Sequence, residues 1–214
     1  METLELRKRY KYLYQPSPRT VKLVKMPPLQ FVMVDGAIEK HEAPDTSVGF
    51  AEAMQAIYGI SYTLKFMLKK RQVDPVDYPV MPLEGLWWVE DRMFDFAVKD
   101  NWHYTLGVMQ PEIITPELLA VGREQVREKR GSTPALERLR LETFDEGLCV
   151  QTMHIGTYSA EPATLEKMQE YMREKGLRDR VGRGGKHHEI YLGDPRRAAP
   201  EKLKTVLRHP VDKA

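Results

Sequence analysis

One short segment of alternating side chains constrains the fold and the function of this chain most. It begins at His187, reads His-His-Glu-Ile-Tyr-Leu, and lies between a glycine-rich stretch and a Gly-Asp-Pro turn, which is typical of a β-strand. Because successive side chains of a strand point to opposite faces, Ile190 and Leu192 share one face. His187, Glu189 and Tyr191 share the other. Strands usually avoid glutamate in their interior, so this second face is either exposed to solvent or lines a site.

The composition of the 214-residue chain is that of a soluble globular protein, with 42% apolar and 30% charged residues. Its 33 basic and 31 acidic residues leave a formal charge of +2, which argues against a protein that coats nucleic acid. We therefore expect no direct nucleic-acid binding. The single cysteine, Cys149, excludes an intramolecular disulfide and a cysteine-rich zinc site, and no cofactor is expected.

The sequence also indicates a compartment. Its longest apolar runs are far shorter than the roughly 18 residues that suggest a membrane span. Met1 is followed by Glu-Thr-Leu-Glu, whereas a secretory signal begins with a basic segment and an apolar core. We expect a cytoplasmic protein without membrane contact.

The chain is predicted to form one domain behind an N-terminal arm. Residues 1–28 are polar, basic and interrupted by prolines, which indicates an arm laid over the core. Two similar units follow, at residues 29–111 and 139–210, and each has the order strand, helix, strand, strand. A helical linker at residues 112–138 joins them, so that residues 29–210 form a single domain of two pseudo-repeats.

The spacing of apolar residues predicts the elements of both units. In the first unit, the strands and the helix are expected at residues 30–35, 48–70, 80–90 and 102–109, with a polar link at 91–100. In the second unit, two strands flank a three-residue turn, which suggests a hairpin. The elements of this unit are expected at residues 139–144, 148–155, 163–175, 187–192 and 203–208. The fold class is therefore α+β, with one curved antiparallel sheet.

Several segments resemble one known family. Residues 150–158 read Val-Gln-Thr-Met-His-Ile-Gly-Thr-Tyr and are followed by Glu-Pro-Ala-Thr from Glu161, and residues 81–88 read Met-Pro-Leu-Glu-Gly-Leu-Trp-Trp. Together with the strand at His187, these motifs resemble the GyrI-like small-molecule-binding proteins, in particular their stand-alone branch. The resemblance covers nearly the whole chain. It departs at residues 37–43, where relatives commonly carry a Gly-Asp-Pro-Asn turn.

The resemblance implies an architecture and a ligand class. Two pseudo-symmetric modules form one curved sheet, with helices on its convex side and a ligand cleft on its concave side. Related domains are effector sensors of multidrug-responsive transcription regulators in bacteria. In them, a glutamate that corresponds to Glu189 lies among aromatic side chains and receives lipophilic, cationic aromatic compounds. Some stand-alone members hydrolyse electrophilic cyclopropane-containing natural products in the same cleft.

The candidate site is centred on Glu189 as a charge anchor, with Tyr191 as its neighbour on the same face. The match between the two units puts Trp87 on that face and turns Trp88 toward the helices, although a one-residue slip exchanges these roles. The other candidates for ligand binding are Trp102, Tyr104 and His154. No metal site is expected, because His187 and the adjacent His188 project to opposite faces.

Two functions are consistent with these residues. The first is polyspecific binding of lipophilic, often cationic aromatic small molecules, in which aromatic faces each add roughly 0.5–2 kcal/mol of attraction to a cation. The second is a hydrolase with Glu189 as general base and Tyr191 as proton donor or orienting group. A second polar group directed at the same ligand atom would favour the enzyme, and the sequence offers Glu84 and His154. An interaction module without a ligand is the third possibility.

Overall fold

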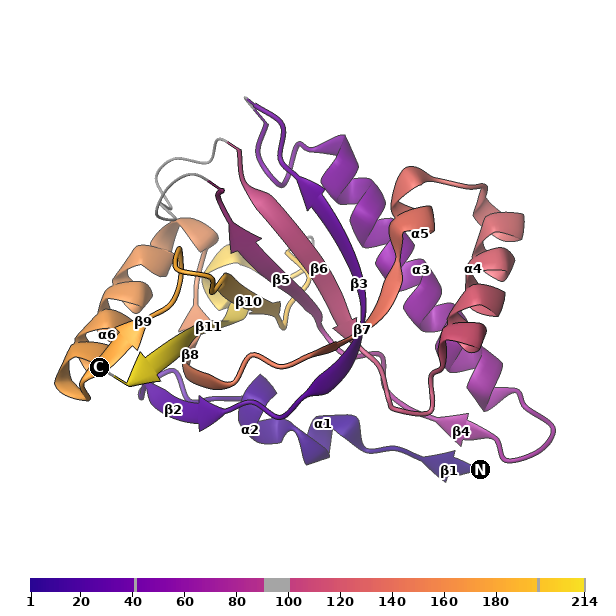
Figure 1. The fold of residues 1–214 in the computed structure, drawn as a ribbon, viewed down its shortest axis with the longest axis horizontal. Helices are drawn as coiled ribbons and strands as arrows, with labels where there is room; N and C mark the ends of the chain where they lie inside the picture. Colours follow the sequence, from indigo (N-terminus) through magenta and orange to yellow (C-terminus); the bar gives the residue numbers. More distant parts are fainter. Residues whose placement is uncertain (41, 91–100, 196, 214) are drawn as a thin grey trace.

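One antiparallel sheet of nine strands carries the fold (Figure 1). The computed structural model describes residues 1–40, 42–90, 101–195 and 197–213. The strands of the sheet are β2 (Lys22–Lys25), β3 (Leu29–Ala37), β5 (Leu83–Trp88), β6 (His103–Met109), β7 (Arg140–Phe144), β8 (Leu148–Ile155), β9 (Leu177–Asp179), β10 (His187–Tyr191) and β11 (Lys204–Lys213). Their order is β2-β8-β11-β10-β5-β6-β3-β7, and β9 pairs with β11 outside this path.

The remaining elements are helices and one small parallel strand pair. The pair joins β1 (Glu2–Thr3) to β4 (Val76–Asp77). The helices are α1 (Leu6–Arg9), α2 (Lys11–Tyr14), α3 (Val48–Lys69), α4 (Pro116–Arg130), α5 (Pro134–Arg138) and α6 (Glu161–Glu174), with short 3₁₀ turns at Tyr158–Ala160 and Pro200–Lys202. Within the described residues, no helix is both long enough and apolar enough to span a membrane.

The sheet is built from two copies of the predicted unit. One copy runs β3, α3, β5, β6, and the other runs β8, α6, β10, β11. In each copy the last strand lies between the other two, and β5 pairs with β10 at the centre of the sheet. This arrangement confirms the α+β fold with duplicated modules. The division of the chain into an arm, two repeats and a linker stays a prediction.

The connection between the two units differs from the predicted hairpin. β7 and β8 do not pair with each other, because β7 adds to β3 and β8 pairs with β2 and β11. Residues 22–33 and 140–151 therefore form one long bent ribbon, in which Met26 N–H donates to the carbonyl of Gly147. The hairpin was predicted from a turn sequence alone. In the structure, the backbone N–H and C=O groups of β7 and β8 form their hydrogen bonds with other strands at open edges of the sheet. The predicted polar link at residues 91–100 lies outside the described residues.

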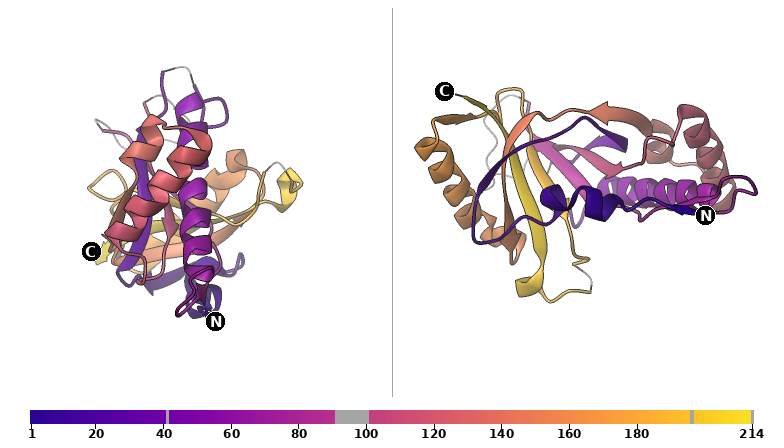
Figure 2. Two further views of the ribbon diagram at one scale, coloured as in Figure 1. Left: turned by 90° about the vertical axis from the view of Figure 1, so that its right-hand side faces the viewer. Right: turned by 90° about the horizontal axis from the view of Figure 1, so that it is seen from below.

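The long helices pack on the same face as Glu189. Phe50 of α3 stacks on Trp87, with ring centroids 5.5 Å apart, and Trp87 lies opposite His187 across the β5–β10 pair. In the other half, α6 packs on Val150 and Leu207. Figures 1 and 2 show α6 at one end of the molecule and α3 with α4 and α5 at the other. The sequence placed the cleft on the face away from the helices. The apolar side chains on the Glu189 face must be shielded from water, and the helices shield them by packing there.

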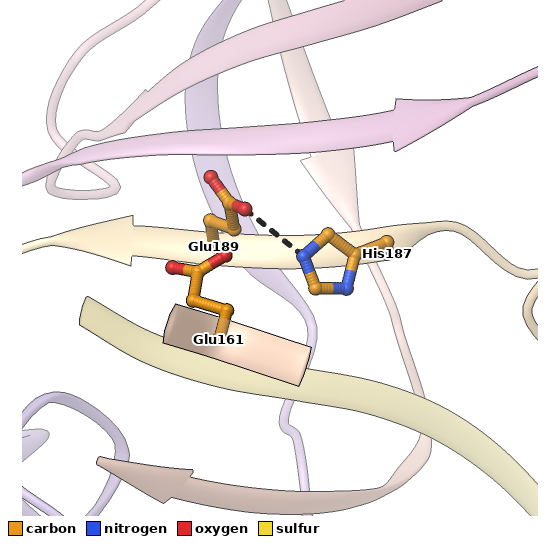
Figure 3. A group of neighbouring side chains, drawn as sticks. All are labelled: Glu161, His187 and Glu189. Carbon is orange, nitrogen blue, oxygen red and sulfur yellow. Dashed lines mark hydrogen bonds and ion pairs between the residues drawn. The ribbon is translucent and has the colours of Figure 1, made fainter. Parts of the chain in front are cut away.

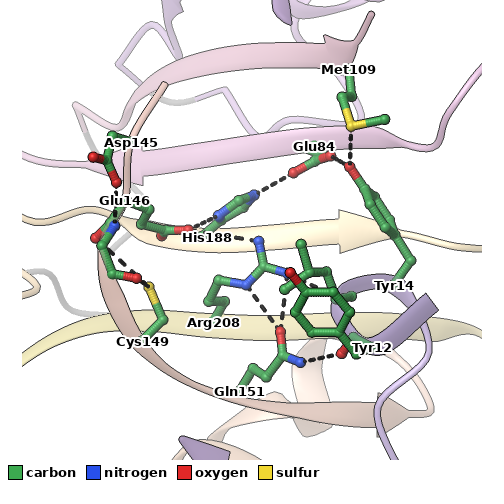
Figure 4. A network of polar contacts seen from close by, with 12 residues as sticks. Tyr12, Tyr14, Glu84, Met109, Asp145, Glu146, Cys149, Gln151, His188 and Arg208 are labelled. Carbon is green, nitrogen blue, oxygen red and sulfur yellow. Dashed lines mark hydrogen bonds and ion pairs between the residues drawn. The ribbon is translucent and has the colours of Figure 1, made fainter. Parts of the chain in front are cut away.

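The N-terminal segment covers the opposite face of the sheet. Leu13, Tyr14 and Met26 are buried against it. Beneath them lies a network of buried polar side chains (Figure 4). The Tyr14 hydroxyl donates to Glu84 over 2.5 Å, and an Arg208 Nη2–H donates to the backbone carbonyl of Leu13 over 3.0 Å. The segment is therefore held by hydrogen bonds to the sheet as well as by apolar packing.

His188 connects the charges of this network. Its Nε2 lies 2.9 Å from Glu84, its Nδ1 lies 2.9 Å from Glu146, and Arg208 approaches Glu146 to 3.6 Å. Burial lowers the pKa of His188, but the two carboxyl groups outweigh it and raise the pKa to about 9. Burial raises the pKa of Glu146, and the charges of His188 and Arg208 bring it below its usual value. Each buried charge of this cluster is thus compensated by an opposite one.

The contact between Tyr14 and Glu84 predicts a difference between two tyrosines of α2. Tyr14→Phe removes a buried donor from Glu84, which we expect to lower the free energy of unfolding by about 1–3 kcal/mol. Tyr12 is half exposed, and Tyr12→Phe is expected to change it by less than about 0.5 kcal/mol. Urea denaturation of both variants measures the difference. Equal effects would show that the hydroxyl of Tyr14 does not hold the arm.

The raised pKa of His188 predicts a pH dependence of stability. The folded protein holds the His188 proton more tightly than the unfolded chain, whose histidine has the ordinary pKa of 6.5. The stabilisation is complete below pH 6.5 and is lost as the pH rises through 9, by about 3 kcal/mol in total. Urea denaturation at both ends of this range measures it. The loss should disappear in His188→Gln and persist in His103→Gln; the same loss in both variants contradicts this origin.

Candidate active site

Strand register places Glu189 at the centre of a closely packed cluster. It lies opposite Gly85 of β5 and Leu207 of β11. A Cβ atom at Gly85 would come within 2.8 Å of Trp87 Nε1 and 2.9 Å of the Tyr191 hydroxyl. Only glycine at this position allows the two side chains to meet over the strand pair.

The carboxylate of Glu189 accepts hydrogen bonds at both oxygens. His187 Nε2 lies 3.0 Å from Oε1, and the Tyr191 hydroxyl donates to Oε2 over 2.5 Å. The Tyr191 oxygen in turn accepts a hydrogen bond of 3.0 Å from Trp87 Nε1. The side chain of Glu189 is 10% exposed, and that of His187 is fully buried. The face predicted from side-chain alternation is therefore an interior polar site and not a solvated strand surface.

A second carboxyl group approaches Glu189 from α6 (Figure 3). Glu161 occupies the first turn of this helix, where Pro162 fits because its missing N–H has no helical partner. The side chain of Glu161 is buried, and one of its oxygens lies within 4.8 Å of ligand atoms of both His187 and Glu189. Two carboxyl groups and an imidazole thus share one buried space.

Hydrogen bonding outweighs burial in setting the charge of Glu189. Burial alone raises the pKa of its carboxyl group, but the hydrogen bonds of His187 and Tyr191, together with the neighbouring Glu161, hold the pKa below its usual value. Burial lowers the pKa of His187 despite the neighbouring carboxylate. Burial and the charge of Glu189 raise the pKa of Tyr191 well above its ordinary value. At neutral pH, the site therefore presents an ionised carboxylate beside a protonated phenol.

Aromatic side chains form one wall of the site. Trp87 lies edge-on to Trp102 at a centroid distance of 5.6 Å and is tilted against Tyr104 at 5.7 Å. Phe50 of α3 closes this group with contacts to Trp87 and Tyr104. Each ring is largely buried. Since Trp87 also bonds to Tyr191, the aromatic wall is linked to the carboxylate through the Tyr191 hydroxyl.

Two of the predicted ligand-binding residues lie apart from this cluster. Trp88 projects to the opposite face, where it stacks on His103 and Lys186 Nζ lies 3.5 Å from its ring centroid. Trp88 therefore does not point toward the helices. His154 lies on the Glu189 face in β8, but its ring nitrogens contact Thr164 Oγ1 at 2.8 Å and the carbonyl of Thr157 at 3.0 Å. Its contacts hold the start of α6 against β8.

The second polar group of the site is not one of those that the sequence suggested. Glu84 lies on the opposite face, bonded to His188 and Tyr14. Glu161 takes this place, and its motif was visible in the sequence, but its proximity to Glu189 depends on the packing of α6. His187 could have been included, because strand alternation already put it on the face of Glu189.

The same three residues form a potential metal-binding group. Among the described residues, Glu161, His187 and Glu189 offer three ligand atoms within 4.8 Å of one another. The expectation of no metal rested on the opposite directions of His187 and His188, and it did not consider Glu161. A metal ion would have to replace the hydrogen bond between His187 and Glu189, so the donor set fits a metal only after rearrangement.

A separate hollow lies away from this cluster. It has a volume of about 740 Å³ and is bounded by the N-terminal segment, the start of β3 and the segment after β6. Its walls include the exposed side chains of Glu5, Lys8 and Arg9. It lacks the convergent buried groups that surround Glu189, so we place the candidate chemistry at Glu189.

Comparison with known protein families matches residues 19–212 to the family described as the GyrI-like small molecule binding domain. No curated protein matches the chain.

Solved structures of similar proteins come from Listeria innocua. An uncharacterized conserved protein shares 39% identity with a TM-score of 0.87, over 98% of this chain and 100% of that one. A protein described as a hydrolase encoded by lin2189 shares 38% identity with a TM-score of 0.85, over 99% and 100%. The C-terminal domain of EcmrR is 9% identical with a TM-score of 0.51, over 91% and 98%, which shows likeness of fold alone.

The close packing at Gly85 predicts a sensitive position. In Gly85→Ala, the new methyl group forces Trp87 and Tyr191 apart, and we expect the free energy of unfolding to fall by about 1–3 kcal/mol. At Gly49 of α3, the nearest atom lies 4.0 Å from an added Cβ. Gly49→Ala should therefore be neutral or stabilising, because alanine favours helix. Urea denaturation compares the two variants, and equal stability changes would contradict the close approach.

Proposed function

The chain belongs to the GyrI-like family of small-molecule-binding domains, and we propose that it is a hydrolase that binds an electrophilic small molecule beside Glu189 and opens it with water. The convergence of two buried carboxyl groups, Glu161 and Glu189, with the Tyr191 hydroxyl carries this proposal. Pairs of titratable groups in different environments are the usual basis of acid–base catalysis. The Listeria innocua relatives described as hydrolases match the chain along its length, which supports the same function.

The two carboxyl groups take opposite roles. Two buried carboxyl groups within 4.8 Å of each other disfavour joint ionisation, and His187 and Tyr191 lower the pKa of Glu189, so the shared proton is expected on Glu161. We therefore assign the base to Glu189 and the acid to Glu161. The raised pKa of Tyr191 makes it a poor acid, so it orients the substrate through a hydrogen bond.

The family resemblance implies electrophilic cyclopropane-containing substrates, and we propose those in which the cyclopropane is conjugated to a carbonyl group. Glu189 takes a proton from water, and the water oxygen bonds to a ring carbon. The strained carbon–carbon bond breaks, and its electron pair moves through the conjugated system to the carbonyl oxygen. Glu161 protonates that oxygen, and the proton on Glu189 then returns to Glu161. The product is the substrate plus one water, and both carboxyl groups are restored.

Substrate binding would also strengthen the base. The hydrogen bond from Tyr191 is one of the contacts that lower the pKa of Glu189. A substrate carbonyl that takes over this hydroxyl removes the contact, so the pKa of Glu189 rises in the complex. The carboxylate is thus ionised in the free site and becomes more basic when the substrate is bound.

A second candidate function is the capture of lipophilic aromatic cations without turnover. The Tyr191 hydroxyl links the ionised Glu189 to Trp87, which belongs to the aromatic wall with Trp102 and Tyr104. Aromatic faces attract cations by roughly 0.5–2 kcal/mol per contact, and a buried carboxylate gains from a delocalised opposite charge. A cation could bind here without reaction.

Replacement of Glu189 distinguishes the two functions. With a cyclopropane-fused dienone in ¹⁸O-labelled water, we expect the wild type to form an ¹⁸O-containing ring-opened alcohol. Glu189→Gln should lower kcat by about 10²–10⁴-fold, with little change in the affinity for this neutral substrate. Glu142→Gln, a partly exposed strand residue, serves as the matched control and should keep full activity.

The same variants also show which results would contradict the hydrolase proposal. Turnover of Glu189→Gln within twofold of the wild type would exclude Glu189 as the base. Absence of wild-type turnover, with tight binding of a fluorescent aromatic cation that Glu189→Gln abolishes, would support the capture function instead. A chelator should leave the wild-type rate unchanged, because the acid and the base are side chains.

A further inference from the structure

A continuous chain of hydrogen-bonding groups leads from Glu189 to the edge of the sheet. His187 Nε2 lies 3.0 Å from Glu189, and its other ring nitrogen lies 2.7 Å from His209 Nε2. His209 Nδ1 lies 2.8 Å from an oxygen of Asp179 in β9. Both histidines are buried, whereas the side chain of Asp179 is 28% exposed. The chain therefore connects the buried carboxylate to a group that touches solvent.

We propose that Glu189 and His209 exchange a proton through His187, and that Asp179 and His209 are positioning residues that set the protonation state of Glu189. The inference rests on the proposed hydrolase function, in which an ionised Glu189 is the base. His187 supplies the path, because each of its two nitrogens contacts one of the exchanging groups.

Counting protons shows why the exchange is possible. Each of the three hydrogen bonds between Asp179, His209, His187 and Glu189 contains one proton, so the four groups share three protons. When both carboxyl groups are ionised, one histidine must be an imidazolium. When the proton moves to Glu189, both histidines are neutral. The two states interconvert when His187 passes its Nε2 proton to Glu189 and accepts the Nε2 proton of His209, and no ring needs to turn.

The surroundings favour the state with an ionised Glu189. Burial raises the pKa of Asp179, but its hydrogen bond with His209 outweighs this effect and lowers the pKa. Burial lowers the pKa of His187, which disfavours a positive charge on that ring, and the carboxylate of Asp179 lies 2.8 Å from His209 at the outer end of the chain. Asp179 thus stabilises a positive charge at the outer end of the chain, and Glu189 keeps its negative charge at the inner end.

Other charged groups face this chain. Glu161 lies at its inner end, and His188 and Glu146 act on the two histidines from the other side of the sheet. At the outer end, Asp212 of β11 lies close to Arg180. These groups also bias the two protonation states, but they are unchanged when Asp179 alone is replaced. Asp179 differs from them because it is hydrogen-bonded to His209 directly.

Asp179→Asn tests the relay without substrate. In the wild type at pH 7, ¹⁵N NMR should show His209 protonated at both nitrogens and His187 protonated at Nε2 only. Loss of the Asp179 charge should lower the imidazolium population of His209. Asp212→Asn, on the neighbouring strand, should leave it unchanged. A neutral His209 in the wild type, or the same imidazolium population in Asp179→Asn, would overturn the proposal.

The pH profile of hydrolysis gives a second readout. In Asp179→Asn the proton moves from His209 to Glu189, so the acidic limb of kcat/KM should shift upward by about 1 pH unit or more. Activity should return at high pH, with KM unchanged. A loss of activity at every pH would indicate a merely structural role for Asp179 and would overturn the relay. If the wild type hydrolyses no substrate, the proposed function fails, and the NMR measurement still decides the relay.

Discussion

The site depends on the ionisation of Glu189 inside the protein. A carboxylate that leaves water loses several kcal/mol of solvation unless hydrogen bonds or charges replace the lost water. Here His187 and Tyr191 supply hydrogen bonds, Glu161 lies close by, and Gly85 leaves the room in which Trp87 and Tyr191 meet. The residues around Glu189 are therefore explained by one requirement, which is to replace the water that its carboxylate loses on burial. A carboxylate that is held in this way is prepared both to accept a proton and to face a cation.

The two faces of the central strands carry different polar networks. His187 and Glu189 project toward the helices, whereas His188 projects to the other face and joins Glu84 and Glu146. The second network is balanced by Arg208 and sealed by the N-terminal segment. Since every charge there has a fixed partner, that network stabilises the fold. The first network contains two carboxyl groups and a path to the solvent, which is the arrangement that proton transfer requires.

Local patterns predicted much of this structure, and long-range packing decided the rest. Side-chain alternation placed Tyr191 beside Glu189, and the match between the two units brought Trp87 to the same face. Alternation cannot show which face the helices cover, so the sequence put Trp88 toward them. Glu161 lies near Glu189 only because α6 packs on β8 and β11, a contact that no spacing reveals. The hairpin prediction failed for the same reason, because β7 and β8 found other partners.

Two buried carboxyl groups as close as Glu161 and Glu189 are expected to hold one proton between them at neutral pH. Infrared difference spectroscopy measures this directly, since a protonated carboxyl group has a carbonyl band distinct from the bands of a carboxylate. One buried protonated carboxyl band is expected in the wild type and should be lost in Glu161→Gln. If Glu161→Gln removes only carboxylate bands, both groups are ionised in the native protein, and the assignment of acid and base is contradicted.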